Sequence, residues 1–353
     1  MKLFSFILLL LAVWPVSAQV EPDSAKADSA GGKTGKAVLY ASLIRSKGYV
    51  VGTELVASGL HRHDGDSAWT PVGWNNPRVN GIAYDPAHPD TMFVAAGNGA
   101  LRTYDGGQSW RITTDWRITE VQDVALDPHA PEHVYLATAY SVWRSRDQGE
   151  TWQEAAEGLP PEGRNYTETI EIDRTTEDRV LVGTTDGVYL STDGAETWQQ
   201  AGGAGLEVLD LQQSPTDPER WIAATYQHGL LLSYNNGTTW TSGPDALADR
   251  SIHGVAFDPF DADRMVAVGW ETGVQITEDG GETWVRRGDT LPEDRFYEAI
   301  FDANVPGRIW AATLEAGVYY SDDLGRTWTS AGLDGTLVFD MLFVYPARGA
   351  GGS

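Results

Sequence analysis

The sequence predicts an all-β protein, a seven-bladed β-propeller in which each blade is a sheet of four strands. Three observations lead to this prediction. A phrase of the form Ser/Thr-x-Asp-x-Gly-x-Thr/Ser-Trp recurs along the chain. Its copies lie about one blade length apart, and the two ends of the repeated region resemble two parts of one blade. No stretch of that region has a convincing helical period.

The repeated phrase occurs six times in clear form and once, nearest the N-terminus, in degenerate form. Its acidic or amide residues are Asp64, Asp105, Asp147, Asp193, Asn235, Asp279 and Asp323. Its closing tryptophans are Trp69, Trp110, Trp152, Trp198, Trp240, Trp284 and Trp328. These tryptophans are 41, 42, 46, 42, 44 and 44 residues apart, which is the length of a four-stranded blade. Seven copies therefore predict seven blades.

Each copy is expected to form the hairpin between the third and fourth strands of a blade. In the sixth blade, residues 255–258 supply the first strand and residues 265–268 supply the second. A short turn containing Gly273 leads into the third strand, and the fourth strand follows the tryptophan. The other clear copies follow the same order.

The residues of the phrase suit a tight hairpin. A short carboxylate accepts hydrogen bonds from turn N–H groups and from the Ser/Thr hydroxyls. The glycine supplies a positive φ, and the tryptophan buries apolar area between neighbouring sheets. Three copies depart from the pattern: Asn235 replaces the carboxylate, Ala195 replaces the glycine, and Asp66 and Ala68 replace the glycine and hydroxyl of the first copy. We expect strain in the turn at Ala195.

The two ends of the repeated region predict how the ring closes. Residues 36–42 match a second strand and have no first strand before them, whereas residues 340–346 match a first strand and have nothing after them. The C-terminal strand is therefore predicted to complete the N-terminal blade, which removes two exposed sheet edges.

The chain outside the repeats predicts export. Residues 1–18 read as a signal peptide cleaved near Ala18, residues 19–36 as a flexible leader, residues 37–346 as the propeller and residues 347–353 as a flexible tail. The protein is expected to be secreted or periplasmic, with no transmembrane segment in the mature chain. It has no cysteine, so no disulfide framework or thiolate metal site is expected, and no cofactor is predicted.

The charge of the chain excludes one class of partner. The formal net charge is -25, and all five lysines lie within the first 47 residues. A nucleic-acid partner is not expected, since phosphates require a basic face. Two explanations of the acidity stay open: attraction of cations or basic partners, or solubility in a salty environment.

The first strands are expected to place one register between blades and the other toward the central axis. The apolar register is Ile82, Val124, Ile170, Leu211, Val255, Ala299 and Leu342. The carboxylates of the axial register, which are candidate cation ligands because oxygen ligands suit calcium, are Asp123, Glu171, Asp210 and Glu298. The seven histidines, among them His61, His63, His228 and His253, show no zinc-type pairing, and all are interpreted as surface residues.

A ligand is expected on the face that carries the connections between blades and the turns between second and third strands. The binding candidates are Trp74, Arg78, Trp116, Arg117, Arg164, Tyr166, Arg250, Arg295, Tyr297 and Trp270. Aromatic rings beside planar charged donors suit sugar or peptide recognition. The alternative is that the arginines and carboxylates of this rim pair with each other.

The hairpins resemble the Asp boxes of the Asp-box (BNR) propellers, a group that includes sialidases, two-propeller xyloglucanases, sortilin-type receptors and photosystem II assembly factors. The resemblance covers residues from about 37 to 346. It implies the propeller fold and places the boxes on the face away from the ligand. The relatives use one scaffold for different functions, so the motif is specific for fold rather than for activity.

Departures from these relatives narrow the choice. Sialidases look like six-bladed propellers with an Arg-Ile-Pro motif, which is absent here. Xyloglucanases place their acid and base between two propellers, and sortilins have more blades and a cysteine-rich module. The photosystem assembly factors match best in size and blade number. The resemblance therefore favours a binding or assembly role.

Two hypotheses of function follow. The first is a monomeric binding or assembly scaffold for a protein or polysaccharide, acting through its loop-rich face. The second is a glycoside hydrolase acting on glycans from the same face, in which Tyr166 and Glu298, with nearby arginines, would supply a sialidase-like site.

Overall fold

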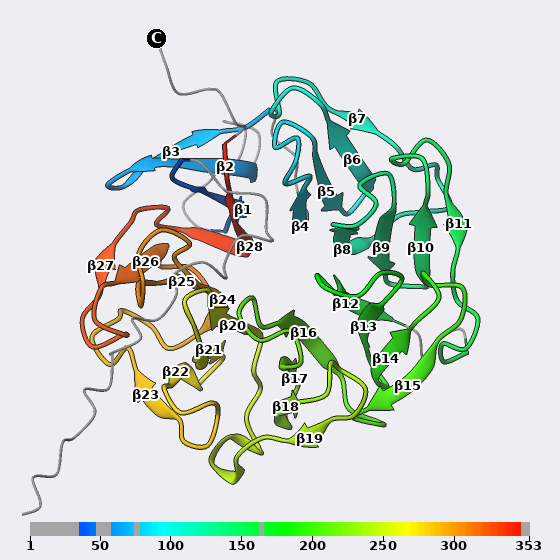
Figure 1. Cartoon of the computed structure of the whole chain (residues 1–353). Helices are drawn as coiled ribbons and strands as arrows, with labels where there is room; N and C mark the ends of the chain where they lie inside the picture. The colour runs from blue at the N-terminus through cyan, green and yellow to red at the C-terminus, as the bar shows by residue number, and fades with distance from the viewer. Residues whose placement is uncertain (1–34, 47–57, 74–77, 162–165, 347–353) are drawn as a thin grey trace, which may run out of the picture. The chain divides into compact units, whose positions relative to one another are not determined.

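The computed structural model describes residues 35–46, 58–73, 78–161 and 166–346. The chain divides into two units, residues 1–34 and 35–353, and everything below concerns the second unit. The predicted signal peptide, the leader as far as residue 34 and the tail lie outside the described residues. The described residues form seven four-stranded antiparallel sheets arranged in a ring (Figure 1). The predicted all-β propeller with seven blades is confirmed.

The blades are numbered from the N-terminus, and their strands are given from the centre of the ring outward. Blade 1 contains β28 (Thr336–Val344), β1 (Val38–Arg45), β2 (Ser58–Gly65) and β3 (Ala68–Pro71). Blade 2 contains β4 (Val79–Tyr84), β5 (Met92–Ala96), β6 (Gly99–Thr103) and β7 (Arg111–Ile112). Blade 3 contains β8 (Val121–Leu126), β9 (Val134–Thr138), β10 (Val142–Ser145) and β11 (Gln153–Glu154).

The remaining blades repeat this order. Blade 4 contains β12 (Thr167–Ile172), β13 (Val180–Thr184), β14 (Gly187–Ser191) and β15 (Gln199–Gly202). Blade 5 contains β16 (Val208–Gln213), β17 (Trp221–Thr225), β18 (Gly229–Ser233) and β19 (Thr241–Ser242). Blade 6 contains β20 (Gly254–Asp258), β21 (Asp261–Gly269), β22 (Gly273–Thr277) and β23 (Val285–Arg287). Blade 7 contains β24 (Phe296–Phe301), β25 (Ile309–Thr313), β26 (Val318–Ser321) and β27 (Thr329–Ser330).

The 3-10 turn η1 (Asp245–Leu247) is the helical element among the described residues. Within this part of the chain no helix is long and apolar enough to cross a membrane.

The hydrophobic core lies between neighbouring blades. Every residue of β17 is buried, including Trp221, because both faces of a second strand are covered by adjacent sheets. One such core joins Leu181 and Val188 of blade 4 to Val208, Leu211 and Trp221 of blade 5.

The ring closes through the two ends of the chain. Strand β28 pairs antiparallel with β1, from Val38 opposite Val344 to Arg45 opposite Thr336. The inner strand of every blade also contacts the inner strand of the next, so the ring has no open seam. The predicted completion of the first blade by the C-terminal strand is confirmed. One detail was wrong: Met341, 4% exposed, occupies the apolar register rather than Leu342, since Met341 pairs with Ala41 of β1 as Ile82 pairs with Val94 of β5.

The Asp-box hairpins are built from side-chain hydrogen bonds to backbone. In blade 2 the Thr103 hydroxyl donates to Asp105 Oδ1 (2.7 Å), and the backbone N–H and hydroxyl of Ser109 donate to the two oxygens of the same carboxylate (2.9 and 2.6 Å). The bonds from Ser109 contribute most to holding the pKa of Asp105 down at about 2. The equivalent bonds recur at Asp147, Asp193, Asp279 and Asp323. The degenerate Asp64 accepts from Arg62 and Thr70 instead.

Each clear hairpin uses two consecutive residues with positive φ, one more than the phrase suggested. In blade 3 these are Gln148 (φ 55°) and Gly149 (φ 81°). In blade 4 the order of residue types is reversed, with Gly194 (φ 68°) followed by Ala195 (φ 61°). Ala195 is fully buried, so its methyl group is held in a left-handed turn by the packing around it.

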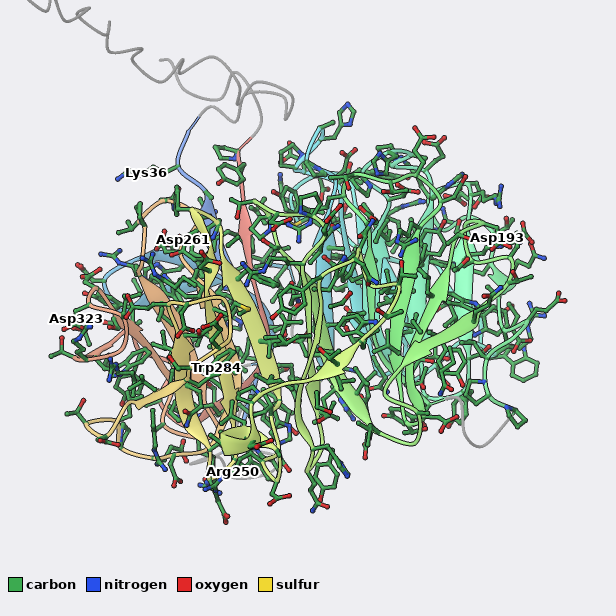
Figure 2. All side chains as sticks on the ribbon, turned by 60° about the horizontal axis from the view of Figure 1, so that its bottom comes forward. Lys36, Asp193, Arg250, Asp261, Trp284 and Asp323 are labelled. Carbon is green, nitrogen blue, oxygen red and sulfur yellow. The ribbon has the colours of Figure 1, made fainter. Side chains whose placement is uncertain are left out.

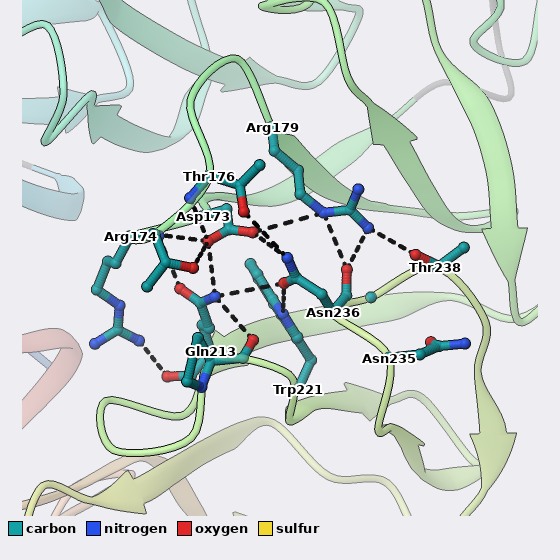
Figure 3. Close-up of polar contacts among 12 residues, drawn as sticks. Asp173, Arg174, Thr176, Arg179, Gln213, Trp221, Asn235, Asn236 and Thr238 are labelled. Atoms are coloured by element: carbon teal, nitrogen blue, oxygen red, sulfur yellow. Dashed lines mark hydrogen bonds and ion pairs between the residues drawn. The ribbon is translucent and has the colours of Figure 1, made fainter.

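A polar cluster at the seam between blades 4 and 5 includes the variable residue of one Asp box (Figure 3). Asn236, with φ 56°, stands where the other clear boxes have Gly, Gln or Leu. Its Nδ2 donates to Asp173 (2.5 Å) and its Oδ1 accepts from Trp221 Nε1 (2.8 Å). Gln213 also donates to Asp173 (3.0 Å). The asparagine therefore satisfies buried polar groups of two blades.

Candidate functional site

The ring has two chemically different faces. The Asp boxes and the turns between first and second strands lie on one, which we call the Asp-box face. The connections between blades and the turns between second and third strands lie on the other, the loop face. Figure 2 shows Arg250 of a connection on the side opposite to Asp261 of a turn. On the Asp-box face, arginines of one blade bind the box of the next; Arg102, for example, donates to Glu150 (2.6 Å).

The inner strands begin at the loop face, and six of them carry a β-bulge near that end. The bulged residues are Asn80, Gln122, Glu168, Leu209, Tyr297 and Phe339. In blade 6, His253 holds the equivalent place, since its N–H donates to Val268 of the neighbouring strand (2.7 Å). A bulge redirects a side chain out of the alternating pattern. The fold thus presents one partly buried residue per blade around the axis.

Aromatic rings from three adjacent blades lie together at this level. The His253 ring centroid is 4.9 Å from that of Trp270 and 5.2 Å from that of Tyr297. The Tyr297 centroid is 6.2 Å from that of Phe339, and the Arg78 guanidinium carbon lies 5.7 Å from the Phe339 centroid. These separations are typical of aromatic and cation–π contacts. We call Arg78, Glu168, His253, Trp270, Tyr297 and Phe339 the axial cluster.

Two ionisable groups of the cluster have shifted pKa values. Burial lowers the pKa of His253 to about 4, so its ring is neutral at pH 7; its Nε2 is buried without a hydrogen-bond partner in the described structure. The interpretation of the histidines as surface residues was wrong for His253, which Trp270 and Tyr297 cover, and for His61, which is 5% exposed. Burial, reinforced by Glu207, raises the pKa of Glu168 to about 7, while Arg78 opposes this shift.

Tyr166 lies within the electrostatic influence of Glu168. Burial and the Glu168 charge raise the pKa of Tyr166 to about 12, and Arg78, Glu120 and Glu207 also act on it. The charges that act most on Glu298 are those of Asp210, Asp340 and Asp123 at the ring axis. The sialidase-like pairing of Tyr166 with Glu298 stays a prediction, and Glu168 is a carboxylate that the sequence did not single out.

The predicted axial carboxylates line the inner strands below the bulges. Asp210 accepts a hydrogen bond from Val255 N–H of the next blade (2.8 Å), and Asp340 accepts one from Ile82 N–H (2.7 Å). Burial and mutual repulsion raise the pKa of Asp340 to about 8 and that of Asp123 to about 6; burial also raises the pKa of Glu171 to about 7. Asp340 was not among the predicted axial carboxylates, although it directly precedes the apolar residue Met341, as Asp123 directly precedes Val124.

These carboxylates do not form a ligand set for a cation. Asp123, Asp210 and Asp340 each accept backbone N–H groups from two blades, and Glu298 accepts from Ala299 N–H (2.8 Å). No group of three His, Cys, Asp or Glu side chains able to hold a metal ion occurs among the described residues. The hydrogen bonds of Asp123, Asp210 and Asp340 to the next blade fit a structural role in joining blades.

The remaining binding candidates divide into three groups. Arg78, Tyr166, Tyr297 and Trp270 meet in or beside the axial cluster. Trp116 is 85% exposed on the loop face, and Arg250 is exposed there. Arg117 pairs with Asp115 (2.6 Å) and Arg295 with Glu293 (2.9 Å), as the alternative of pairing within the rim predicted. Trp74 and Arg164 lie outside the described residues.

Comparison with known proteins agrees with the fold. A family model described as "Sortilin, neurotensin receptor 3" matches residues 98–227. No curated protein matches the chain. Residues 98–227 are therefore similar to sortilin, and the seven-bladed β-propeller is similar in fold to several solved structures.

Three of these structures show the range of relatives. The GH74 enzyme of Niastella koreensis superposes with a TM-score of 0.68 at 17% identity over 86% of this chain; the match spans 56% of that enzyme. YCF48 from Cyanidioschyzon merolae gives 0.56 at 16% identity over 71% of this chain and 84% of YCF48. An extracellular domain from B. thetaiotaomicron gives 0.60 at 16% identity, covering 82% of this chain and 39% of that one. The chain thus spans about half of the GH74 enzyme.

Proposed function

We propose that this protein is an exported, monomeric binding or assembly scaffold that recognises a protein or polysaccharide partner through its loop face. The observation that carries the proposal is the axial cluster, in which aromatic rings, an arginine and a carboxylate from four blades meet at the start of the inner strands. Such a combination offers stacking surfaces and charged hydrogen-bonding groups together.

The two faces differ in how their polar groups are used. On the Asp-box face, the carboxylates and arginines bind the protein's own turns and neighbouring blades. On the loop face, Trp116, Tyr140, Tyr226 and Trp270 are exposed aromatic residues, with Trp270 at 42%. A solved structure of YCF48 is described as bound to the D1 peptide, which supports a peptide-binding role for a propeller of this type.

A comparison of the two faces tests the proposal. The purified chain, a Trp270→Ala/Tyr297→Ala variant and a Tyr234→Ala control on the Asp-box face would be incubated with the native envelope fraction. A partner identified with wild type, rebound in purified form, should be retained by the control and lost by the loop-face variant. Equal retention by all three proteins, or loss caused by the control, would contradict recognition through the loop face.

Export has its own test. The signal peptide is predicted to be cleaved near Ala18. N-terminal sequencing of the protein isolated from its source is therefore expected to begin close to residue 19. A mature protein that retains Met1 and stays inside the cell would contradict an exported scaffold without affecting the loop-face argument.

A second candidate function, glycoside hydrolysis, is favoured by one observation. Glu168 has a pKa near 7 and lies within the electrostatic influence of Tyr166, Arg78 and Glu207, and a carboxylic acid protonated near neutrality is what a general acid requires. Chromogenic glycosides test it. Turnover that is lost in Glu168→Gln but kept in Glu298→Gln would support hydrolysis at this site; absence of turnover would leave the scaffold as the function.

A further inference from the structure

The axial cluster has an aromatic side and an acidic side. His253, Trp270, Tyr297 and Phe339 form the aromatic side, in blades 6, 7 and 1. The acidic side is marked by Glu168, whose charge acts on Tyr297 as well as on Tyr166. Glu168 and Tyr297 are also the bulged residues of β12 and β24, so both lie near the loop-face end of the inner strands.

The Glu168 carboxylate is not satisfied by the protein. Within the described residues it has no hydrogen bond and no ion pair, and the groups that act on it, Glu207 and Arg78, do so only through their charges. Arg78 directs its Nε to Asn80 Oδ1 (2.8 Å) and lies over the Phe339 ring. A partly buried carboxylate without a partner is costly, which a ligand cation would relieve.

The charge around the cluster favours such a cation. Glu120, Glu168 and Glu207 all act on Tyr166, and the charge of Arg78 opposes them. Further along the axis stand Asp123, Asp210, Glu298 and Asp340, whose pKa values are raised mainly by burial, so they are not counted in this charge. The chain beyond residue 47 has no lysine, so arginine carries the fixed positive charge that could balance these groups. The excess of negative charge therefore complements a positively charged ligand.

The aromatic side of the cluster also suits a positively charged ligand. A guanidinium or ammonium group is attracted to the face of Tyr, Trp or Phe, and the cluster already holds one guanidinium, that of Arg78, over Phe339. The Tyr297 and Trp270 rings lie next to that pair, with 5.9 Å between their centroids.

We propose that the axial cluster captures an arginine or lysine side chain from a basic segment of a partner protein, with its charge against Glu168 and its side chain against Tyr297. This inference rests on the proposed function, because it names the chemistry of the partner that the loop face recognises. It excludes a neutral glycan as the ligand of this position.

Defined peptides test the proposal. The probes are Ac-Gly-Gly-Arg-Gly-Gly-NH2 and its citrulline counterpart, which has nearly the same shape but no charge, titrated by calorimetry into the purified chain. We expect the arginine peptide to bind roughly tenfold more tightly, with affinity that weakens as salt is added. Glu168→Gln should reduce its affinity to that of the citrulline peptide. Glu132→Gln, the same change on the exposed Asp-box face, should have no effect.

The pH dependence of binding provides a second readout. Glu168 is faced by Arg78, Glu207, Tyr166 and Tyr297, and its own pKa is about 7. A cation binds its ionised form, so affinity for the arginine peptide should rise between about pH 6 and pH 8. This rise should be absent in Glu168→Gln. A rise of equal size in that variant would contradict the assignment to Glu168, and melting curves of both variants would establish that they are folded.

The outcomes separate this inference from the proposed function. Equal affinity for the two peptides, or no binding of the arginine peptide at millimolar concentration, would overturn the capture of a cation. If a neutral β-glucan oligosaccharide binds and is lost in Trp270→Ala/Tyr297→Ala, the inference fails while loop-face recognition stands. A concentration-dependent dimer lost in the same variant would assign the surface to a second copy, again against the inference. A native partner retained by that variant would contradict the proposed function itself.

Discussion

The carboxylate of Asp123 joins two blades: its Oδ2 accepts a hydrogen bond from the backbone N–H of Ile170 in blade 4, 2.9 Å away. Its Oδ1 accepts from Val124 N–H in its own strand (2.7 Å). The same connection is repeated by Asp210 between blades 5 and 6 and by Asp340 between blades 1 and 2. The ring is thus fastened at its centre by acid side chains as well as by apolar packing.

Replacing Asp123 with alanine should destabilise the protein. The change leaves the N–H groups of Ile170 and Val124 without partners near the axis, which costs about 1–3 kcal/mol for a buried unsatisfied group. Asp289→Ala is the control, since the side chain of Asp289 is 86% exposed. Chemical denaturation measures both; equal midpoints would show that Asp123 does not fasten the blades.

Stability should depend on pH in two opposite ways. The folded-state pKa values of Asp123, Glu171 and Asp340 are raised to about 6, 7 and 8, mainly by burial, so the folded protein binds more protons than the unfolded chain. Their contribution is fully present only below about pH 4, near the unfolded pKa values, and is lost as pH rises from there through about 6 to 8. Boxes such as Asp105 and Asp279 have pKa values lowered to about 2, so their contribution is lost as pH falls from about 4 toward 2.

The melting temperature is therefore expected to pass through a maximum near pH 4 and to fall as the pH rises toward 8. Measuring it from pH 2 to pH 9 checks this, and Asp340→Asn, which removes a titrating group at the centre, should reduce the fall on the alkaline side. A melting temperature that increases steadily from pH 5 to pH 9 would mean that the central carboxylates are not held in their protonated forms.

Ala195→Gly should stabilise the fold by a fraction of a kcal/mol, because a glycine at φ 61° relieves the strain of a left-handed alanine. The gain is limited by the loss of one buried methyl group. Differential scanning calorimetry would show a small rise in melting temperature. An unchanged or lower value would indicate that methyl packing outweighs the relief of backbone strain.

Asn236→Gly is a matched change with the opposite expected sign. It relieves a similar φ of 56°, but it removes the donor to Asp173 and the acceptor for Trp221. We expect a loss of about 1–3 kcal/mol, since buried polar groups are left unpaired. Equal effects of the two glycine substitutions would mean that the seam cluster contributes nothing beyond the backbone conformation of the turn.

Removing residues 337–346 should abolish cooperative unfolding of the intact ring, because β1 loses its partner β28. A circular permutant gives the control. Gly35 and Pro346 lie side by side, since a Cβ added to Gly35 would be 2.9 Å from Pro346 Cγ. A short linker between these ends, with new termini at residues 333 and 334, should preserve the fold. A truncated chain as heat-resistant as the intact one would contradict closure through β28.

Much of the architecture was predictable because short sequence phrases determine each hairpin and recur in every blade. Each Asp-box carboxylate lies within four residues of the groups that it binds, so the hairpins follow from short sequence phrases. The spacing of the tryptophans set the number of blades, and the incomplete repeats at the two ends indicated that β28 would pair with β1. Several arginines of the loop face were also expected there correctly, because blade topology fixes which connections share a face.

The composition of the axial cluster was decided by tertiary structure. Glu168 and Phe339 point toward the axis because bulges interrupt the strand alternation, and a bulge leaves no mark in a single sequence. Glu168 and Tyr297 are 129 positions apart in the chain, and the charge of Glu168 acts on Tyr297 because the ring arranges their blades around one axis. Local hydrogen bonding thus determined each blade from the sequence alone, whereas the electrostatic neighbours of each acid depended on which blades the ring brings together.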